Sequence, residues 1–295
     1  MRYQFIDNHR DMYPVQRMCK LLKVSSSGYY SWRNRVPSER KMANQEIVKQ
    51  IETIHQESYE TYGSPRIHNE LQENGVECSE NRVARLMRAH NIRAKRRKKR
   101  KLTTKANKKH PKSANVLDRE FAASRPNEKW TTDITYIPTS EGWLYLAIVL
   151  DLFSRRIVGW AMSARMTSDL VISALNMAIA QRQPEPGLLH HSDRGSQYTG
   201  AAYTKLLRDN LMLSSMSRTG NCWDNAVSES LFGTVKTELT HHCSYETRRE
   251  AKSDIFFYME SFYNRRRRHS TLGYMSPDAY EVAFYKHQTV LTQYP

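Results

Sequence analysis

Three carboxylic acids in this 295-residue chain stand where they could do chemistry together. Asp133 lies in the alternating stretch KWTTDITYIP, Asp193 ends the apolar run GLLHHSD, and Glu229 follows after 35 intervening residues (194–228). Phosphodiester cleavage develops negative charge on an attacking and a leaving oxygen, which two divalent cations about 3.5–4 Å apart can stabilise. Mg²⁺ prefers oxygen ligands and binds through few carboxylates. Three such acids on separate elements therefore predict a two-metal site for phosphoryl transfer.

The pattern around the acids predicts the elements that would position them. Acids occupy 30 of the 295 positions, so the spacing of these three acids is by itself weak evidence for a shared site. The stronger evidence is the secondary-structure element on which each acid is expected to lie. The order of strands and helices predicts a mixed five-stranded sheet flanked by helices, of α/β (α+β) class. Asp133 falls in the first strand, Asp193 at the end of the fourth and Glu229 on the last helix. The expected strands are 129–138, 142–151, 156–163, 187–193 and 213–217, and the expected helices are 167–181, 199–211 and 223–239.

The charge of the chain indicates a polyanionic partner. Lysine and arginine number 46 against 30 acids, which gives a net charge of +16, and nucleic acid is the commonest partner of so basic a chain. Twelve of the twenty residues from 93 to 112 are basic, so this block is expected to be an extended or disordered linker. Its candidate DNA contacts are Arg96, Arg97, Lys98, Lys99 and Arg100.

Two helical units precede the basic block. The first, at about 12–35, has apolar residues at helical spacing and is equally compatible with a helix-turn-helix and a plain helical hairpin. The second, at 62–92, is expected to begin one helix with Ser64 as its cap and another with Ser79 as its cap. Three arginines at a spacing of three share one face of that second helix, as a DNA-recognition helix requires: Arg82, Arg85 and Arg88.

Several other classes of protein are disfavoured. No run of about 18 apolar residues occurs, so no membrane span is expected, and the first residues lack the apolar stretch of a signal peptide. The four cysteines lie far apart without a C-x-x-C pair, which is typical of reduced cytosolic thiols and not of a disulfide framework or a zinc site. No Walker pattern occurs, so ATP dependence is not expected.

Four segments, taken in order, carry a resemblance to a known family: RPNEKWTTDITYI, HHSDRGSQYTG, SRTGNCWDNAVSESLFGTVKTEL and YNRRRRHSTLGYMSPDAYE. They resemble the catalytic core of bacterial insertion-sequence transposases, most nearly the second-frame (OrfB) product of the insertion sequence three family. That core is similar to retroviral integrases in the DDE transposase and integrase superfamily. The resemblance runs from about Tyr13 to Glu281 and implies a ribonuclease H-like fold.

The resemblance assigns roles to the three acids and to one lysine. The family's acidic triad falls on Asp133, Asp193 and Glu229, which implies that these residues hold two Mg²⁺ (or Mn²⁺) ions. Lys236 falls on the family's basic position seven residues after the glutamate. Seven residues are about two helical turns, so Lys236 shares a face with Glu229 and would contact DNA near the cleaved phosphate.

The C-terminal signature also matches the family, at Tyr263, Asn264, Arg267 and His269. Contact with DNA, by Arg267 and His269, and support of the core are both open as roles for this segment. The predicted organisation is a helical region at 1–60 with a helix-turn-helix, a second helix-turn-helix at 61–95, a basic linker at 96–122, an integrase-like catalytic core at 123–240 and a helical extension at 241–295.

Other polar residues compete for the site. Asp151 matches a family position outside the triad and ranks below Asp133. Asp224 and Asn225 are expected to cap the helix that carries Glu229. Only one of His190 and His191 can face the site, because neighbouring residues of a strand point to opposite faces.

These observations predict a DNA transposase that cleaves the ends of its element and transfers the freed 3′-hydroxyl, integrating or circularising the element. Alternatives are a catalytically silent DNA-binding regulator, which the intact triad disfavours, and a ribonuclease H-like nuclease, which the separate DNA-binding helices disfavour. Expected partners are the terminal inverted repeats, target DNA and further copies of the chain, in the bacterial cytoplasm at the nucleoid. In this family a first-frame product, separate or fused by frameshift, often adds a coiled coil; no sustained heptad segment occurs here.

Overall fold

The computed structural model describes residues 1–36, 38–95, 115–218 and 222–293, and it contains two compact units, Met1–Glu52 and Thr53–Pro295. The basic residues Arg96 to Arg100, predicted to contact DNA, lie outside the described residues. No helix in the described ranges has the length and apolar character needed to cross a membrane.

The first unit is built from short helices around a small apolar core. It contains α1 (Arg2–Asn8), α2 (Val15–Leu21), α3 (Ser26–Arg33) and the first part of α4 (Glu39–Glu57). The Ser25 hydroxyl accepts a hydrogen bond from the Gly28 amide and caps α3, as the sequence predicts. The Tyr29 ring is fully buried, and its hydroxyl donates to Asp7 at 2.8 Å. The helices of the 12–35 prediction are therefore present, whereas their contact with DNA stays a prediction.

The second unit begins with the helix pair α5 (Ser64–Glu73) and α6 (Glu80–Ala89). Ile67 and Leu71 of α5 and Val83 of α6 are fully buried, because apolar residues at helical spacing face the same side. The Ser79 hydroxyl accepts from the Arg82 amide, which confirms the predicted cap of α6. The predicted cap of α5 is wrong by one residue, since Gly63 occupies that position and Ser64 already lies in the helix.

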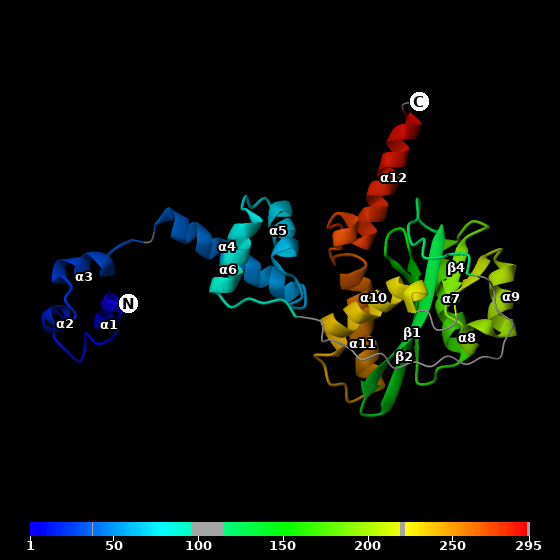
Figure 1. Cartoon of the computed structure of the whole chain (residues 1–295), viewed down its shortest axis with the longest axis horizontal. Coiled ribbons are helices and arrows are strands. Elements are labelled where there is room, and N and C mark those ends of the chain that lie inside the picture. The colour runs from blue at the N-terminus through cyan, green and yellow to red at the C-terminus, as the bar shows by residue number, and fades with distance from the viewer. Residues whose placement is uncertain (37, 96–114, 219–221, 294–295) are drawn as a thin grey trace. The chain divides into compact units, whose positions relative to one another are not determined.

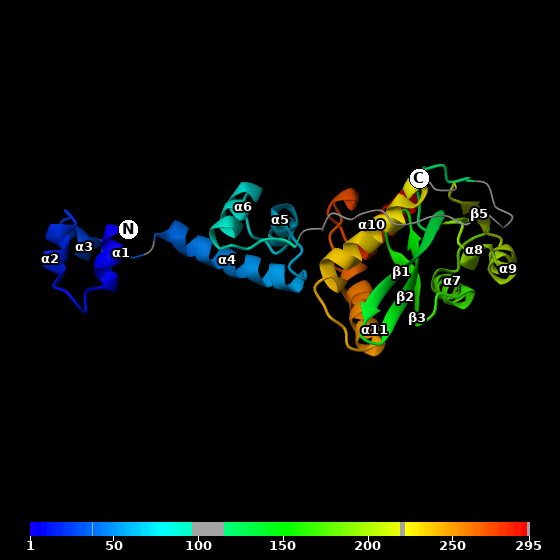
Figure 2. The ribbon, with the colours of Figure 1, turned by 60° about the horizontal axis from the view of Figure 1, so that its bottom comes forward.

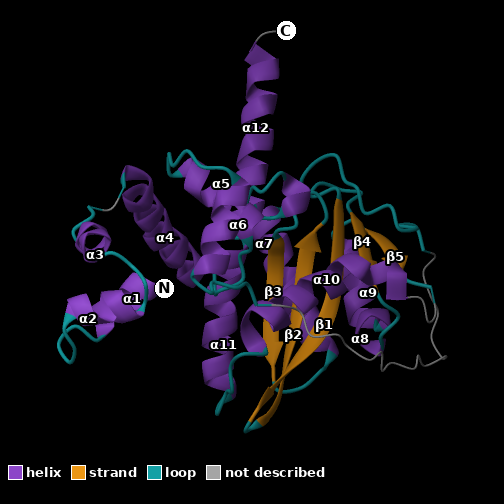
Figure 3. Cartoon of the chain, turned by 60° about the vertical axis from the view of Figure 1, so that its left-hand side comes forward, coloured by secondary structure: helices purple, strands orange, loops and turns teal. Residues whose placement is uncertain are grey.

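The centre of the second unit is a five-stranded mixed sheet in the order β3-β2-β1-β4-β5 (Figure 3). The strands β1, β2 and β3 form an antiparallel meander, and β4 and β5 run parallel to β1. This sheet confirms the predicted fold class. Its strands are β1 (Lys129–Thr139), β2 (Gly142–Asp151), β3 (Ile157–Ser163), β4 (Leu189–Ser192) and β5 (Leu213–Met216).

Helical crossovers make the parallel pairs possible, because parallel strands cannot be joined by a tight turn. The helix α7 leads from β3 to β4, and α8 and α9 lead from β4 to β5 (Figure 1). After β5 the chain forms a short 3₁₀ turn η1 and then α10, which continues as a π-helical segment η2. The helices are α7 (Ser168–Arg182), α8 (Ser196–Thr199), α9 (Ala201–Asp209), η1 (Cys222–Asn225), α10 (Ala226–Val235), η2 (Lys236–Thr240), α11 (Arg248–Phe257), the π-helical η3 (Tyr258–Tyr263), the 3₁₀ η4 (Ser270–Leu272) and α12 (Pro277–Gln293).

Different helices pack against the two faces of the sheet. On one face α7 and α9 pack over the core cluster, which includes Trp130, Ala147 and Val149. On the other face lie α10 and α11 (Figure 2). Since side chains alternate along a strand, Trp130 belongs to the α7 face and Asp133 to the α10 face. The acid is thereby separated from the main apolar core by the sheet itself.

Close packing of β3 against α7 depends on a glycine. A Cβ atom added at Gly159 would lie 2.3 Å from the carbonyl oxygen of Ala174 and 2.7 Å from the Cβ of Ala178. Real Cβ atoms do not approach backbone so closely, so a side chain here would push α7 away from the sheet.

Gly159→Ala is therefore expected to lower the free energy of unfolding by about 1–3 kcal/mol, the usual cost of overpacking a core. Thermal unfolding of the full chain measures this. Gly63→Ala is the control, because its added Cβ would have its nearest neighbour at 3.8 Å. Equal melting temperatures for the two variants would contradict the close approach.

Candidate active site

Asp133 and Asp193 are held in place by backbone hydrogen bonds. The Ile134 amide donates to Oδ1 of Asp133 at 2.8 Å, and the Gly195 amide donates to Oδ1 of Asp193 at 2.8 Å. Gly195 cannot easily be replaced, since an added Cβ would lie 2.9 Å from that same Asp193 oxygen. Both acids are partly exposed, at the middle of β1 and just beyond the end of β4.

Glu229 lies in the first turn of α10 and is exposed. The helix is joined to β1 by Thr131, whose hydroxyl donates to Asn225 Oδ1 at 2.9 Å and lies 3.0 Å from the Ser228 hydroxyl. Thr131 and Asp133 are two residues apart and share a face of the strand. The helix that carries Glu229 is thus fixed to the strand that carries Asp133.

The charges of the other two acids act on Asp133. The pKa of Asp133 is raised from 3.8 to about 8, first by burial and then by the charges of Asp193 and Glu229, while the Ile134 amide and the charge of Lys236 oppose the rise. Burial also raises the pKa of Asp193. Coulombic effects of this kind need groups within several ångströms. Asp193, Glu229 and Lys236, which the sequence selected, therefore lie near enough to act on Asp133, and their catalytic roles stay predictions.

Tyr198 is a neighbour of the acids that the sequence did not single out. Its ring is 1% exposed in α8 and belongs to the apolar core cluster that includes Trp130. After burial, the charge of Asp133 is the next largest cause that raises the pKa of Tyr198, and Asp193 adds to it. Tyr198 is therefore a core residue that lies close enough to the two aspartates for their charges to act on it. The only sequence signal is its position five residues after Asp193.

The two histidines before Asp193 point to opposite faces of the sheet. His191 pairs in register with Thr131, so it shares the face of Asp133, but its ring nitrogens lie 2.9 Å from the Ser215 hydroxyl and 3.1 Å from the Ser217 hydroxyl. His190 lies on the α7 face, and its Nε2 is 3.1 Å from the Tyr203 hydroxyl. Burial lowers the pKa of His190 to about 3 and that of His191 to about 4. Both rings are neutral packing residues near pH 7.

Asp224 anchors the start of α10 without capping it. This fully buried carboxylate accepts hydrogen bonds from the backbone and guanidinium of Arg218, from Arg119 at 3.1 Å and from Asn115 at 3.0 Å. These donors, Arg218 first, hold the pKa of Asp224 well below its usual range. Asn225 occupies the N-cap position of α10 as expected, but its side chain makes no capping hydrogen bond and instead accepts from Thr131, and Asp224 does not cap the helix.

Glu238 anchors the other end of the same helix. Its carboxylate is buried and accepts from Arg267 Nε at 2.8 Å, from Arg267 Nη2 at 2.6 Å and from the Tyr258 hydroxyl at 2.6 Å. Arg66 of α5 lies 3.9 Å away as a second cation. This buried, bidentate ion pair fixes η2, which continues the helix of Glu229.

The C-terminal signature therefore supports the core. Arg267 is 5% exposed, and His269 packs edge-on against Tyr263 with a ring-centroid distance of 5.0 Å. Burial and the charge of Arg267 keep the pKa of His269 far below its ordinary value, so it adds no positive charge. Arg267 is buried and His269 is half-buried in this structure, and contact of either residue with DNA stays a prediction. Asn264 bonds both backbone groups of Ile157, each at 3.0 Å.

The remaining candidate DNA contacts differ in accessibility. Arg85 and Arg88 of α6 are exposed, and Arg82 is half-buried. Lys236 is 6% exposed, with its ammonium 4.9 Å from the centroid of the Tyr136 ring. Contact of these residues with DNA stays a prediction.

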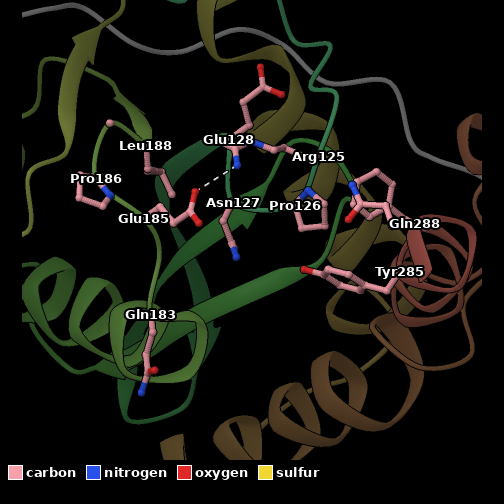
Figure 4. A pocket seen from close by; sticks show the side chains of 12 residues that line it. Arg125, Pro126, Asn127, Glu128, Gln183, Glu185, Pro186, Leu188, Tyr285 and Gln288 are labelled. Atoms are coloured by element: carbon pink, nitrogen blue, oxygen red, sulfur yellow. Dashed lines mark hydrogen bonds and ion pairs between the residues drawn. The ribbon is translucent and has the colours of Figure 1, made fainter. Parts of the chain in front are cut away.

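Asp151 lies away from the triad. It ends β2, opposite Trp130 near the start of β1, and it accepts from the amides of Asn127 and Phe153 at 2.7 and 2.8 Å. A polar cavity of about 390 Å³ opens at this same end of the sheet, lined by residues before β1, the α7–β4 loop and α12 (Figure 4). Because the triad lies further along β1 and beyond the end of β4, this cavity is not the site of the acids.

Comparison with known proteins defines first the class of the chain. Residues 123–222 match a family model described as an integrase core domain, 212–277 match a second model of that description, and 42–100 match an HTH-like domain. Among solved structures, the HTLV-2 integrase catalytic core in complex with magnesium is 18% identical, with a TM-score of 0.39 over 50% of this chain and 92% of that one. The BIV integrase core is 15% identical, with a TM-score of 0.41 over 55% and 99%.

Two relatives then define the family. Transposase InsF of insertion sequence IS3A from Escherichia coli (strain K12) is 40% identical over 286 residues, which are 95% of this chain and 98% of the relative. A 31 kDa protein of insertion element IS600 from Shigella sonnei is 44% identical over 269 residues, 91% of this chain and 99% of the relative. The chain belongs to the IS3 family of insertion-sequence transposases, as its motifs predict.

The raised pKa of Asp133 predicts a pH dependence of stability in the metal-free chain. Between pH 4 and pH 8 the folded chain holds a proton that the unfolded chain has released, so the free energy of unfolding falls as pH rises through this window. Asp133→Asn removes this contribution. Urea unfolding across the window measures it, with Asp209→Asn, an exposed acid of α9, as the control. Identical pH slopes for wild type and Asp133→Asn would show that Asp133 ionises normally.

The buried pair of Glu238 and Arg267 predicts a large stability effect. Arg267→Met leaves a buried carboxylate without its cation and is expected to cost about 3–5 kcal/mol in the free energy of unfolding. Adding Glu238→Gln should recover part of this loss, because the uncompensated charge is removed. Arg266→Met is the matched control, since that side chain is 60% exposed and such pairs contribute about 1 kcal/mol or less. An Arg267→Met loss no larger than the control's would refute the anchoring role.

Proposed function

We propose that this transposase cleaves the ends of its own element with Asp133, Asp193 and Glu229 and joins the freed 3′-hydroxyl to another phosphodiester. The observation that supports this most is that the charges of Asp193 and Glu229 both act on Asp133 and help to raise its pKa. Strand transfer between the two ends of one element would give a circle, and transfer to target DNA would give integration.

The donor set suits Mg²⁺ or Mn²⁺. All three side chains offer carboxylate oxygens, which hard divalent cations prefer, and the negative charges of Asp193 and Glu229 that act on Asp133 are charges a cation would offset. Within the described ranges no three His, Cys, Asp or Glu side chains are grouped closely enough to hold an ion already.

The residues of the proposed site have separate roles in the reaction. Asp133, Asp193 and Glu229 would hold two ions. When bound, the two ions would activate the attacking oxygen and stabilise the leaving oxygen. The backbone bonds to Asp133 and Asp193 keep their carboxylates oriented. No side-chain nucleophile is required, because water and then the 3′-hydroxyl attack directly.

DNA binding would be shared by two regions. The exposed Arg85 and Arg88, with Arg82, would contact phosphates and base edges from α6, and the basic block would neutralise phosphates without regard to sequence. Lys236 would act closest to the cleaved phosphate. We further propose that several copies assemble on DNA, because both ends of an element must be held together for joining.

Cleavage of a labelled duplex that carries the end of the encoding element tests this function. Asp193→Asn is expected to lower the Mg²⁺-dependent cleavage rate by roughly a thousandfold or more, since several kcal/mol of transition-state stabilisation are lost. DNA affinity should be unchanged in the same variant. Asp209→Asn is the matched control, an aspartate paired with Lys205 on the surface of α9.

Cleavage by Asp193→Asn at the wild-type rate would overturn the assignment of the acids. If the wild type bound the duplex but neither cut nor joined it with Mg²⁺ or Mn²⁺, the chain would be a silent DNA-binding regulator. Faster cleavage of an RNA–DNA hybrid than of the element end would indicate a ribonuclease H-like nuclease.

A further inference from the structure

Two large aromatic rings are exposed on the hairpin that carries Asp133. Tyr136 of β1 is 50% exposed and Trp143 of β2 is 48% exposed. Their ring centroids lie 4.9 Å apart at an interplanar angle of 78°, so one ring presents its edge to the other. Isolated exposed apolar residues are ordinary, but a paired set of rings beside charged catalytic candidates suggests a binding surface.

One lysine links the aromatic pair to the site of the acids. Tyr136 follows Asp133 by three residues in β1, so its side chain lies on the opposite face of the strand, the face of Trp130. The Lys236 ammonium lies 4.9 Å from the Tyr136 ring centroid, and the charge of the same lysine also acts on Asp133. One cation therefore borders both the acids and the rings.

The edge of β1 next to this pair is open to a ligand. In the register of the described strands, β4 pairs with β1 only from Lys129 to Thr131. From Thr132 onward, none of the described strands therefore lies beside β1 on that side. A substrate chain lying against the acids on one face of β1 can pass round this edge, beside Lys236, to Tyr136 on the other face.

We propose that Tyr136 and Trp143 form a stacking surface for an unpaired base of the DNA held at the acids. This rests on the proposed function and deepens it by naming the form of the substrate. Every nucleobase has an aromatic face that can stack on such rings, whereas the faces of bases inside a duplex are covered by their neighbours. The surface therefore selects a base that has left the helix, and the adjacent cation suits the phosphate that follows it.

A fluorescent base tests the stacking surface without catalysis. The full chain with Asp193→Asn is mixed with a short duplex that carries 2-aminopurine in an unpaired extension, and separately with the same duplex fully paired. Stacking is expected to quench the unpaired probe. Tyr136→Ala should abolish the quenching and weaken the preference for the unpaired probe by about tenfold, which is ~1.4 kcal/mol. Trp143→Ala should act in the same direction, and Tyr136→Phe should retain both effects.

Tyr285→Ala is the matched control, because Tyr285 is also 50% exposed and pairs edge-on with Phe284, beside the cavity at the other end of the sheet (Figure 4). Equal quenching by wild type and Tyr136→Ala would overturn the proposal. So would an equal loss of affinity for paired and unpaired probes, which indicates a general contact. A smaller oligomer without DNA in Tyr136→Ala would instead assign the rings to contact between copies. Failure of Mg²⁺-dependent cleavage in the wild type would leave the quenching result standing and refute only the proposed function.

Discussion

Mutual repulsion among three carboxylates is the constraint on which the arrangement of the catalytic unit depends. Asp133 sits in partly buried surroundings, where the charges of Asp193 and Glu229 disfavour its ionised form. A flexible scaffold would let these charges separate. Each acid is instead carried by a different element, and each element is fixed by contacts that do not involve the acids.

The helix that carries Glu229 is the most heavily fixed of these elements. Its start is held by the buried Asp224 with its arginines and by Thr131, and its continuation η2 is held by Glu238 with Arg267. Buried ion pairs often add little net stability, yet breaking one leaves an uncompensated charge. Such pairs therefore raise the free energy of every arrangement of the helix that breaks them. This fixes the position of Glu229 even where the pairs add little to stability.

The same contacts explain why the chain after the core belongs to the catalytic unit. Arg267 reaches back to the helix of Glu229, Asn264 pairs with the edge strand β3, and Arg268 forms ion pairs with Glu70 and Glu73 of α5. Arg66 of the same α5 approaches Glu238. The helix pair that is predicted to bind DNA and the helix that carries Glu229 thus share one buried polar network. A change in the position of α5 would therefore change the contact of Arg66 with Glu238 in η2.

The sequence alone determined what depends on local pattern and composition. The alternation around Asp133, the continuous apolar run of β2 and the helical spacing of α7 reflect which face of each element is buried, so the five strands and the position of the acids could be predicted. The caps at Ser25 and Ser79 follow from short-range hydrogen bonding. The net charge and the basic block likewise indicate a nucleic-acid partner, because both depend on composition and not on the fold.

Only the tertiary structure decided which distant residues meet. An arginine in a basic run predicts a DNA contact. The neighbouring sequence does not indicate that Arg267 is buried against Glu238, which lies 29 positions earlier. The two histidines are equivalent in sequence, and only the register of β4 against β1 assigns His191 to the face of the acids and ties both of its nitrogens to serines of β5 and the residue after it. Tyr136 reads as an ordinary strand residue until the partial pairing of β4 leaves its edge of β1 open. In each case the physical reason is the same: burial and partnership come from contacts between segments far apart in the chain, which spacing along the sequence does not encode.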